Sequence, residues 1–349
     1  LDFAVMASLV SQVARLHQQG VEVIIVTSGA IAAGRHRLKV AGDSKEVPMR
    51  QVMAAVGQGL LMQAYDELFG SHDIIPAQTL LTRQDLADRQ GYLNARNTLL
   101  SLLQLRIVPI VNENDVVAID EIAGAKIGDN DNLSALVANL VDADLLVLLG
   151  DIDGLYDADP RRNPNAKLIR RVDKIDTEIE RYAGASGSER GVGGMVTKVQ
   201  AARLATSGGA DVIIASGHEE NVLLRTVNGE EVGTLFPSSA DKVESRKRWM
   251  LAGLALKGDV VIDAGAASAL YKNHSSLLPA GITEVHGSFQ RGDPISILTQ
   301  EGQPLGYGIA NYSAVDLQAI KGLRSNQIEE RLGHQYGGEA VHRNNLVLL

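Results

Sequence analysis

The feature that most constrains the fold is a repeated succession of short apolar runs and helical patterns. The apolar runs lie at residues 21–26, 74–80, 107–111, 145–149 and 212–215. Apolar spacing typical of helices lies at residues 2–19, 48–69 and 92–105, from near Asn130 to Val141, and at 199–205. Runs without polar alternation are typical of strands buried on both faces of a parallel sheet. We therefore predict an α/β fold with an open, mostly parallel sheet and helices on both faces.

Small residues follow the first predicted strand. Ser28 and Gly29 come directly after the run that ends at Val26 and Thr27, and they open a helical pattern. Such a turn lets a ligand approach backbone N–H groups and the positive end of the helix dipole. Close packing of the helix on the strand explains the same residues equally well.

Two polar clusters lie between residues 111 and 134, in the sequence VNENDVVAIDEIAGAKIGDNDNLS. The first includes Asp115 and follows a predicted strand, and the second includes Asp129, Asn130 and Asp131 and precedes a predicted helix. One such cluster is usually explained by turn and capping chemistry. Two clusters in one connection favour a binding site for a polar small molecule.

Residues 184–198 form a loop rich in Gly and Ser that ends at Lys198 and opens a helix. Neither G-x-x-x-x-G-K-[ST] nor G-x-G-x-x-G occurs, because Val196 stands where the last glycine of the second motif belongs. Exposed N–H groups, the Thr197 hydroxyl and the Lys198 charge would suit the phosphates of a nucleoside triphosphate. A surface loop without a ligand is an equally good interpretation of the loop alone.

The pattern changes near Lys242. After it come short runs separated by Gly and Pro, which predict a small, mostly β module. We expect a first domain over residues 1–241, a linker over 242–257 and the β module over 258–349. The residues from Lys242 onward carry 11 Lys and Arg against 10 Asp and Glu, whereas the chain as a whole carries 33 against 42. The acidity therefore belongs to the first domain.

Composition excludes several classes of function. The formal net charge of −9 argues against a general affinity for nucleic acid or anionic membranes. The absence of cysteine excludes disulfides, thiolate catalysis and Cys-based zinc sites. No apolar run approaches the roughly 20 residues that span a bilayer, so we expect a cytoplasmic protein with no membrane partner.

Four motifs in order resemble the glutamate 5-kinases (γ-glutamyl kinases) of the amino acid kinase family. They are VTSGAIAAG at 26–34, VNEND at 111–115, GDNDNLSA at 128–135 and GVGGMVTK at 191–198. SSLLPAG at 275–281 and NYS at 311–313 resemble the PUA domain that bacterial members carry at the C-terminus. The resemblance covers nearly the whole chain.

The resemblance implies ATP-dependent phosphorylation of the glutamate side-chain carboxylate, the first step of proline biosynthesis. It implies Mg²⁺ as cofactor, without identifying the metal ligands, proline as feedback inhibitor, and a homo-oligomer, dimer or tetramer. By position, Lys198 and Asp131 are catalytic. The residues implied to bind glutamate are Ser28, Gly29, Asp115, Asp129 and Asn130. Those implied to bind ATP are Gly150, Asp151, Val192, Gly193, Gly194, Met195, Val196, Thr197 and Lys198.

The sequence departs from the family pattern at three places. Gly150 and Val192 replace threonines, so hydroxyl contacts there are lost. Family members also begin with a strand and a K-x-G-[ST]-S loop that brings another lysine to the phosphates, whereas this sequence begins at Leu1 within a helical pattern. Loss of a central strand would cost more than the about 5–15 kcal/mol of typical domain stability. We therefore expect the natural start to lie upstream, and we do not expect the chain to turn over without that strand.

Other functions remain open at this point. Aspartokinase, acetylglutamate kinase and uridylate kinase share the sheet, although the two polar clusters and the β module favour the glutamate enzymes. An RNA-binding protein acting through the PUA domain is a second class, with Arg246–Lys247–Arg248–Trp249 as a basic-aromatic patch. A solvated linker is the better explanation of that patch, and we expect no RNA partner. A regulatory kinase-like subunit is a third class. For proline, we expect a site in the loop at residues 121–126.

Overall fold

The computed structural model describes residues 1–42, 46–118, 130–185, 194–238, 256–273 and 275–349. It divides the chain into two compact units, unit 1 from Leu1 to Asp241 and unit 2 from Lys242 to Leu349. The predicted linker lies outside the described residues except at its last two positions. None of the described helices is both long enough and apolar enough to cross a membrane.

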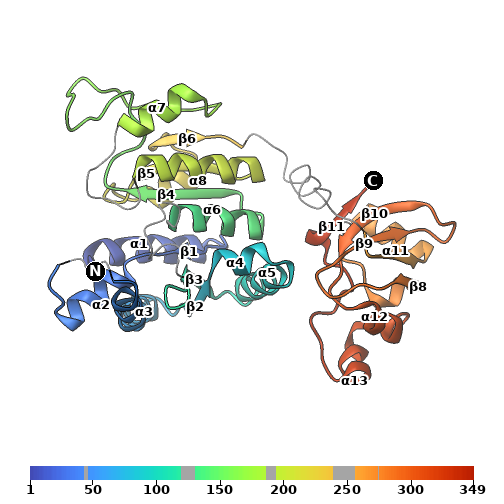
Figure 1. Cartoon of the computed structure of the whole chain (residues 1–349). Coiled ribbons are helices and arrows are strands. Elements are labelled where there is room, and N and C mark those ends of the chain that lie inside the picture. Colours follow the sequence, from blue (N-terminus) through green and yellow to red (C-terminus); the bar gives the residue numbers. More distant parts are fainter. Residues whose placement is uncertain (43–45, 119–129, 186–193, 239–255, 274) are drawn as a thin grey trace. The chain divides into compact units, whose positions relative to one another are not determined.

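Unit 1 alternates strands and helices as predicted (Figure 1). Its strands are β1 (Ile25–Val26), β2 (Pro76–Leu81), β3 (Val108–Glu113), β4 (Leu145–Gly150), β5 (Asp211–Ser216) and β6 (Thr234–Phe236). Its helices are α1 (Phe3–Gln18), α2 (Ala30–Leu38), α3 (Val47–Gly70), α4 (Arg83–Ala87), α5 (Arg89–Gln104), α6 (Asn130–Val141), α7 (Thr177–Ala185), α8 (Met195–Gly208) and α9 (Val222–Val227). The α/β class is confirmed.

The described strands of unit 1 form two three-stranded sheets, with orders β1-β3-β2 and β4-β5-β6. Every pair is parallel except β5 with β6. Strand β1 is shorter than the predicted run at residues 21–26, because only Ile25 and Val26 pair with β3, opposite Ile110 and Val111. The expected single sheet is thus described as two, and three of the four strand pairs are parallel.

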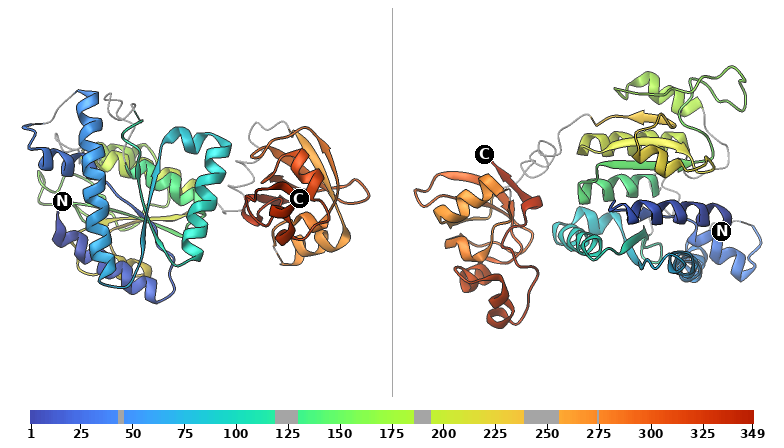
Figure 2. Two further views of the ribbon diagram at one scale, coloured as in Figure 1. Left: turned by 90° about the horizontal axis from the view of Figure 1, so that it is seen from below. Right: turned by 180° about the vertical axis from the view of Figure 1, so that it is seen from behind.

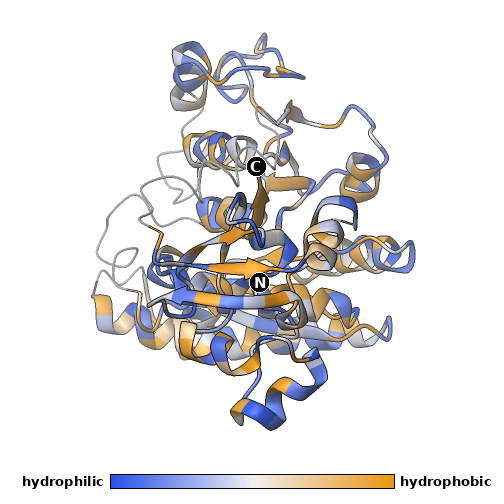
Figure 3. Cartoon of the chain, turned by 90° about the vertical axis from the view of Figure 1, so that its right-hand side faces the viewer, coloured by the Kyte–Doolittle hydropathy of each residue, from blue (hydrophilic) through white to orange (hydrophobic). Residues whose placement is uncertain are grey.

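Helices cover both faces of these sheets (Figure 2, left). Side chains of β3 alternate between the two faces: Ile110 is buried with residues of α1 and α3, and Val111 with residues of α5 and α6. This alternation follows from the two-residue period of a strand. In Figure 3 the strands are largely hydrophobic while the helices carry both colours, as expected for helices with one buried face.

Helices α1 and α6 connect the two sheets by packing. Val10 of α1 is buried with Ile110 of β3, and its neighbour Leu9 packs on the cluster around Ile213 of β5. On the other face, Leu133 of α6 is buried beside β3, and Ala135 is buried with residues of β4 and β5. The start of α6 is therefore held between the halves of the unit.

Helices α2 and α3 cross at two glycines. A Cβ on Gly57 of α3 would lie 1.7 Å from the Ala30 carbonyl oxygen, and one on Gly34 of α2 would lie 1.8 Å from the Met53 carbonyl oxygen. Only glycine allows backbones to approach this closely. The crossing places the start of α2, which follows Ser28 and Gly29, directly on α3.

Unit 2 has its own core and a five-stranded sheet of order β11-β10-β9-β7-β8. Its strands are β7 (Gly258–Ile262), β8 (Ile282–Gly287), β9 (Pro294–Leu298), β10 (Pro304–Ile309) and β11 (Leu346–Leu348), and its helices are α11 (Ala264–Asn273), α12 (Ala314–Ile320) and α13 (Ile328–Leu332). The β-sheet was predicted, whereas the helices were not, because their short apolar patterns are interrupted by Gly and polar residues.

Candidate functional site

The carboxyl end of β4 and the first turns of α6 and α8 meet in one cluster. The Nζ of Lys198 on α8 lies 2.8 Å from Oδ1 of Asp131 on α6, and both side chains are only 12% exposed. Lys198 also passes close to the strand end, since a Cβ on Gly150 would lie 3.1 Å from its Cε. We refer to Asp131, Gly150, Thr197 and Lys198 as the phosphate cluster, after the ligand that the sequence predicts for it.

Asp131 uses both carboxylate oxygens. Its Oδ2 accepts a hydrogen bond from the Thr197 hydroxyl at 2.8 Å while Oδ1 accepts from Lys198. The Thr197 oxygen also lies 2.7 Å from the Gly194 carbonyl oxygen, and its single proton serves one acceptor at a time. Asp131 thus fixes the position of the lysine charge at the start of α8, where N–H groups and the helix dipole favour an anion.

Other predicted ATP-binding residues have mixed positions. Gly194 is the N-cap of α8, and Met195 is buried in the core, so Met195 can offer only its N–H to a phosphate. Val196 is 41% exposed, and Asp151 is exposed just after β4. Val192 and Gly193 lie outside the described residues.

Asn130 starts α6 beside Asp131. Its Oδ1 is buried and has no hydrogen-bond partner among the described residues. Buried amide oxygens are normally hydrogen-bonded, so this oxygen is suited to accept a hydrogen bond. Its neighbour Asp129 and the proposed proline loop at 121–126 lie outside the described residues.

The remaining predicted substrate residues follow β1 and β3, at the carboxyl end of the first sheet. Ser28 is exposed, and Gly29 has a φ of +98° as the N-cap of α2. Asp115 is half-buried two residues after β3, where Val117 and Ala118 donate to the Asn114 carbonyl oxygen. Carboxyl ends of neighbouring parallel strands lie at the same edge of a sheet, so these residues line one edge.

Helix α3 supports this edge with residues that the sequence did not single out. The Tyr65 hydroxyl lies 3.0 Å from the Thr27 hydroxyl, just before Ser28, and burial raises the pKa of Tyr65. Gln58 accepts a hydrogen bond from Asn112 and Gln51 donates one to the Val116 carbonyl oxygen. The signal was present as two glutamines seven positions apart on an apolar helix, but the pattern does not say what they face.

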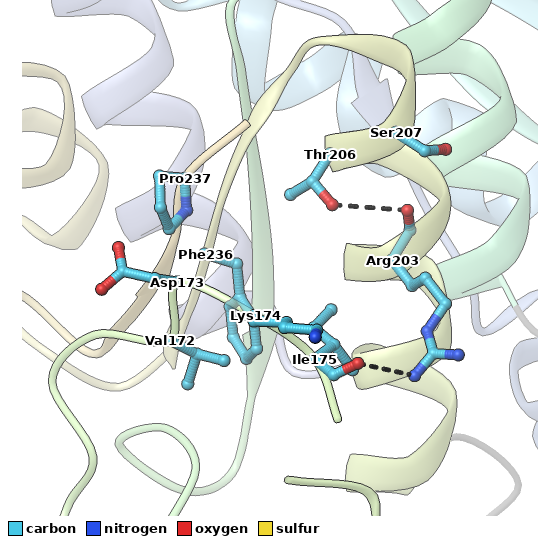
Figure 4. A pocket seen from close by; sticks show the side chains of 9 residues that line it. All are labelled: Val172, Asp173, Lys174, Ile175, Arg203, Thr206, Ser207, Phe236 and Pro237. Atoms are coloured by element: carbon cyan, nitrogen blue, oxygen red, sulfur yellow. Dashed lines mark hydrogen bonds between the residues drawn. The ribbon is translucent and has the colours of Figure 1, made fainter. Parts of the chain in front are cut away.

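A separate cavity of about 280 Å³ lies between the second half of α8 and the end of β6 (Figure 4). Arg203 donates to the Ile175 carbonyl oxygen at 3.2 Å, and the Thr206 hydroxyl lies 3.3 Å from the Arg203 carbonyl oxygen. Lys198 is in the first turn of the same helix, so this cavity is distinct from the phosphate cluster. No group of three or more His, Asp or Glu side chains that could hold a metal occurs in the described ranges.

Comparison with known sequences identifies the class. Residues 2–216 match the model of the amino acid kinase family, and residues 258–332 match the PUA domain. The chain belongs to the amino acid kinase family and carries a PUA domain.

The curated relatives are more specific. A glutamate 5-kinase of Dehalococcoides mccartyi (strain CBDB1) is 53% identical over 100% of this chain and 94% of its own length. One from Herpetosiphon aurantiacus is 51% identical over 98% of this chain and 92% of its own length. Among solved structures, an isopentenyl phosphate kinase is 16% identical with a TM-score of 0.45, covering 67% of this chain and 91% of that one. The predicted resemblance to glutamate 5-kinases is confirmed by the curated relatives.

Proposed function

We propose that the protein transfers the γ-phosphoryl group of ATP to the side-chain carboxylate of L-glutamate, forming γ-glutamyl phosphate and ADP at the first step of proline biosynthesis. The observation that carries the proposal is the partly buried Lys198–Asp131 pair at the start of α8. The glutamate 5-kinase relatives, which match the chain along its whole length, support the choice of substrate.

The chemistry needs no general base. A glutamate carboxylate with an ordinary pKa of about 4.3 is already ionised at neutral pH. Its oxygen forms a new bond to the γ-phosphorus as the bond from that phosphorus to the bridging oxygen of ADP breaks. Catalysis then consists of alignment and of neutralising charge on the transferring oxygens. Lys198 and the N–H groups at the start of α8 supply the positive charge on the protein side.

Mg²⁺ would enter with the nucleotide as MgATP and would supply further positive charge at the phosphates. Magnesium is usually held by one or two carboxylates together with substrate phosphates. Asp131 is already paired with Lys198, which favours coordination of the ion mainly by the phosphates.

The acceptor lies at the edge formed by Ser28, Gly29 and Asp115. Asp115 pairs with the α-ammonium group of glutamate, while Ser28 and the N–H groups at the start of α2 bind carboxylate oxygens. Asn130, whose buried Oδ1 has no partner among the described residues, accepts a hydrogen bond from the ammonium group or from a bound water. This division explains how an acidic edge binds an acidic substrate.

Two further properties belong to the proposal by family membership. Proline restrains the reaction, and the protein works as a homo-oligomer. Inhibition of turnover by added proline and a mass above that of one 37.2 kDa chain in light scattering are the respective measurements.

The central test is glutamate-dependent release of ADP by the full-length protein. We expect release with L-glutamate and little with L-aspartate or N-acetylglutamate. Lys198→Met should lower kcat by about 10²–10³-fold, the usual effect of removing one charge-stabilising group. Lys174→Met, at an exposed lysine beside the separate cavity, is the matched control. Release with aspartate or acetylglutamate but not with glutamate would overturn the substrate assignment.

A further inference from the structure

Two glutamines of α3 hold the ends of the segment that carries Asp115. We define the Asp115 segment as residues 112–116. At its start, Asn112 Nδ2 donates to Gln58 Oε1 at 2.9 Å, and at its end the Val116 carbonyl oxygen accepts from Gln51 Nε2 at 2.8 Å. Seven helical positions span about 10 Å, and the segment bends into a turn at Asp115 and Val116, so its two ends can reach both glutamines.

Backbone groups determine which way each amide points. The Val116 carbonyl oxygen can only accept, so Gln51 must donate to it. The Glu113 N–H can only donate, and it does so to Asn112 Oδ1 at 2.9 Å. Asn112 therefore presents its NH₂ group to Gln58, which must accept. The two glutamines have the same chemistry but opposite hydrogen-bonding roles.

The site at Gln58 is more enclosed than a surface contact. Asn112 is 2% exposed, so its NH₂ group is shielded from bulk water while Gln58 is in place. The Gln58 Nε2 donates to Gln78 Oε1 on β2 at 2.9 Å, and this second hydrogen bond helps to orient the Gln58 amide. A chain of amides thus ties β3 to α3 and α3 to β2 at the acceptor edge.

The same helix also holds the Ser28 side of the edge. Gly57, next to Gln58, contacts the first turn of α2, and Tyr65 contacts Thr27. Both segments that carry predicted acceptor residues therefore take their positions from α3.

We infer that Gln51 and Gln58 are positioning residues for the phosphoryl acceptor: they set the place of Asp115 without touching the substrate. The inference rests on the proposed function for the identity of the acceptor, whereas the hydrogen bonds themselves do not depend on it. A shift of the Asp115 segment weakens binding of the acceptor and leaves the nucleotide side unchanged.

Because the two glutamines have opposite hydrogen-bonding roles, the inference can be tested by placing an acceptor and a donor in turn at each position. Gln58→Glu keeps an acceptor for Asn112, and the exposed Gln78 amide can turn its NH₂ group toward the new carboxylate. Gln51→Lys keeps a donor for the Val116 carbonyl oxygen. Gln58→Glu and Gln51→Lys should therefore stay within about threefold of the wild-type KM for glutamate. Gln58→Lys faces the NH₂ group of buried Asn112 and should raise that KM about tenfold or more, the cost of a buried unpaired donor. Gln51→Glu faces the carbonyl oxygen of exposed Val116 and should raise that KM by a smaller factor that still exceeds about threefold. The KM for ATP should change by less than about twofold in all four variants.

Gln63 supplies the matched control. It is exposed on α3 and bonds only to Glu67, a neighbour on the same helix, in the described structure. Gln63→Glu and Gln63→Lys introduce the same charges at no contact with the Asp115 segment, so they should leave both KM values unchanged. A simple charge effect would make both glutamate variants alike and both lysine variants alike, and that pattern would overturn the inference.

A second readout separates this inference from the proposed function. Hydrogen exchange followed by mass spectrometry reports on the amides of Asn114, Val117 and Ala118, which donate to backbone oxygens in or beside the segment. Gln58→Lys and Gln51→Glu should speed their exchange, and the other two variants should not. If exchange is faster only in Gln58→Lys and Gln51→Glu but the wild-type protein shows no glutamate-dependent ADP release, the substrate assignment is wrong and the positioning role stands. Uniform exchange in all four variants, or equal rises in the KM for ATP and for glutamate, would remove the positioning role.

Discussion

At the scale of single residues, the most informative contact is the one that uses both oxygens of Asp131. Oδ1 holds Lys198 and Oδ2 holds Thr197, so this carboxylate sets the geometry of two residues of the phosphate cluster. For the proposed reaction we expect Asp131 to orient the lysine rather than to move a proton, since the acceptor carboxylate is already ionised at neutral pH.

Asp131→Asn should therefore lower kcat by about 10²-fold, comparable to the loss of one oriented electrostatic group. The amide cannot neutralise Lys198, and its NH₂ group competes with the ammonium group for position. Steady-state release of ADP measures the effect. Asp173→Asn, at an exposed carboxylate 2.8 Å from Arg171, should leave kcat unchanged. Equal activity of Asp131→Asn and wild type would contradict the orienting role.

Glu339 in unit 2 provides a prediction about pH. Burial raises the pKa of its carboxyl above the ordinary 4.5, against hydrogen bonds from its own N–H and that of Gly338. A raised pKa in the folded state contributes stability below pH 4.5 and loses it as the pH rises through the folded value. Glu339→Gln should thus gain stability relative to wild type between pH 4 and pH 7, as measured by urea midpoints.

Glu301 is the matched control with the opposite sign. A hydrogen bond from the Thr299 side chain lowers its pKa, so its carboxylate contributes stability above pH 4.5 and loses it as the pH falls. Glu301→Gln should lose stability relative to wild type at pH 7 and approach it at pH 4. If the stability of both variants relative to wild type changed in the same direction with pH, the local environments of Glu339 and Glu301 would not control the pH dependence.

At the scale of elements, the close crossing of α2 and α3 depends on glycine, which has no side chain. Gly57→Ala would place a Cβ 1.7 Å from the Ala30 carbonyl oxygen and should cost about 1–3 kcal/mol or more through overpacking. Gly59→Ala, two positions away on α3 with nothing within 4 Å of its Cβ, should instead gain about 0.5–1 kcal/mol from helix propensity. Chemical denaturation measures both, and equal effects would contradict the close crossing.

Much of this element structure could be predicted from periodicity. The apolar runs at 107–111, 145–149 and 212–215 became β3, β4 and β5 with shifts of one or two residues at their ends. Buried strands of this kind have few alternatives, because their continuous apolar character fits only a sheet covered on both faces. Strand β1 was shorter than its run because ladder pairing depends on the partner strand, which local pattern does not encode.

The sequence predicted part of the candidate site and missed the residues of α3 that support it. Lys198 and Asp131 were named from motifs, and the structure places them 2.8 Å apart across 67 positions of sequence. Gln51 and Gln58 were missed because a polar side chain on a helix is most often solvated. Their roles depend on the register of α3 against β3, which is a tertiary property.

At the scale of the whole molecule, the chain contains two units with separate cores. One core of unit 1 contains Phe69, which is fully buried, and that of unit 2 contains Phe289, which is 1% exposed. We propose that residues 1–241 and 258–349 are independent structural domains, the first holding the catalytic machinery.

Calorimetry of the whole protein should then show two transitions. Phe289→Leu should lower the midpoint temperature of one transition and Phe69→Leu that of the other. The loss of unfolding free energy in each case should be smaller than the about 3–5 kcal/mol typical of Phe→Ala. Turnover should disappear with the transition that Phe69→Leu shifts. Movement of both midpoints by either substitution would show that the units unfold as one.

The amide chain from Asn112 through Gln58 to Gln78 contains no group that gains or loses a proton in the physiological range. Its hydrogen bonds therefore persist through acidification that would protonate a carboxylate or charge a histidine in the same place. Acidification of the cell interior during stress would alter the charge of ionisable groups around the acceptor. It would not alter the hydrogen bonds of the amide chain. Any acid sensitivity of acceptor binding consequently comes from ionisable groups outside this amide chain.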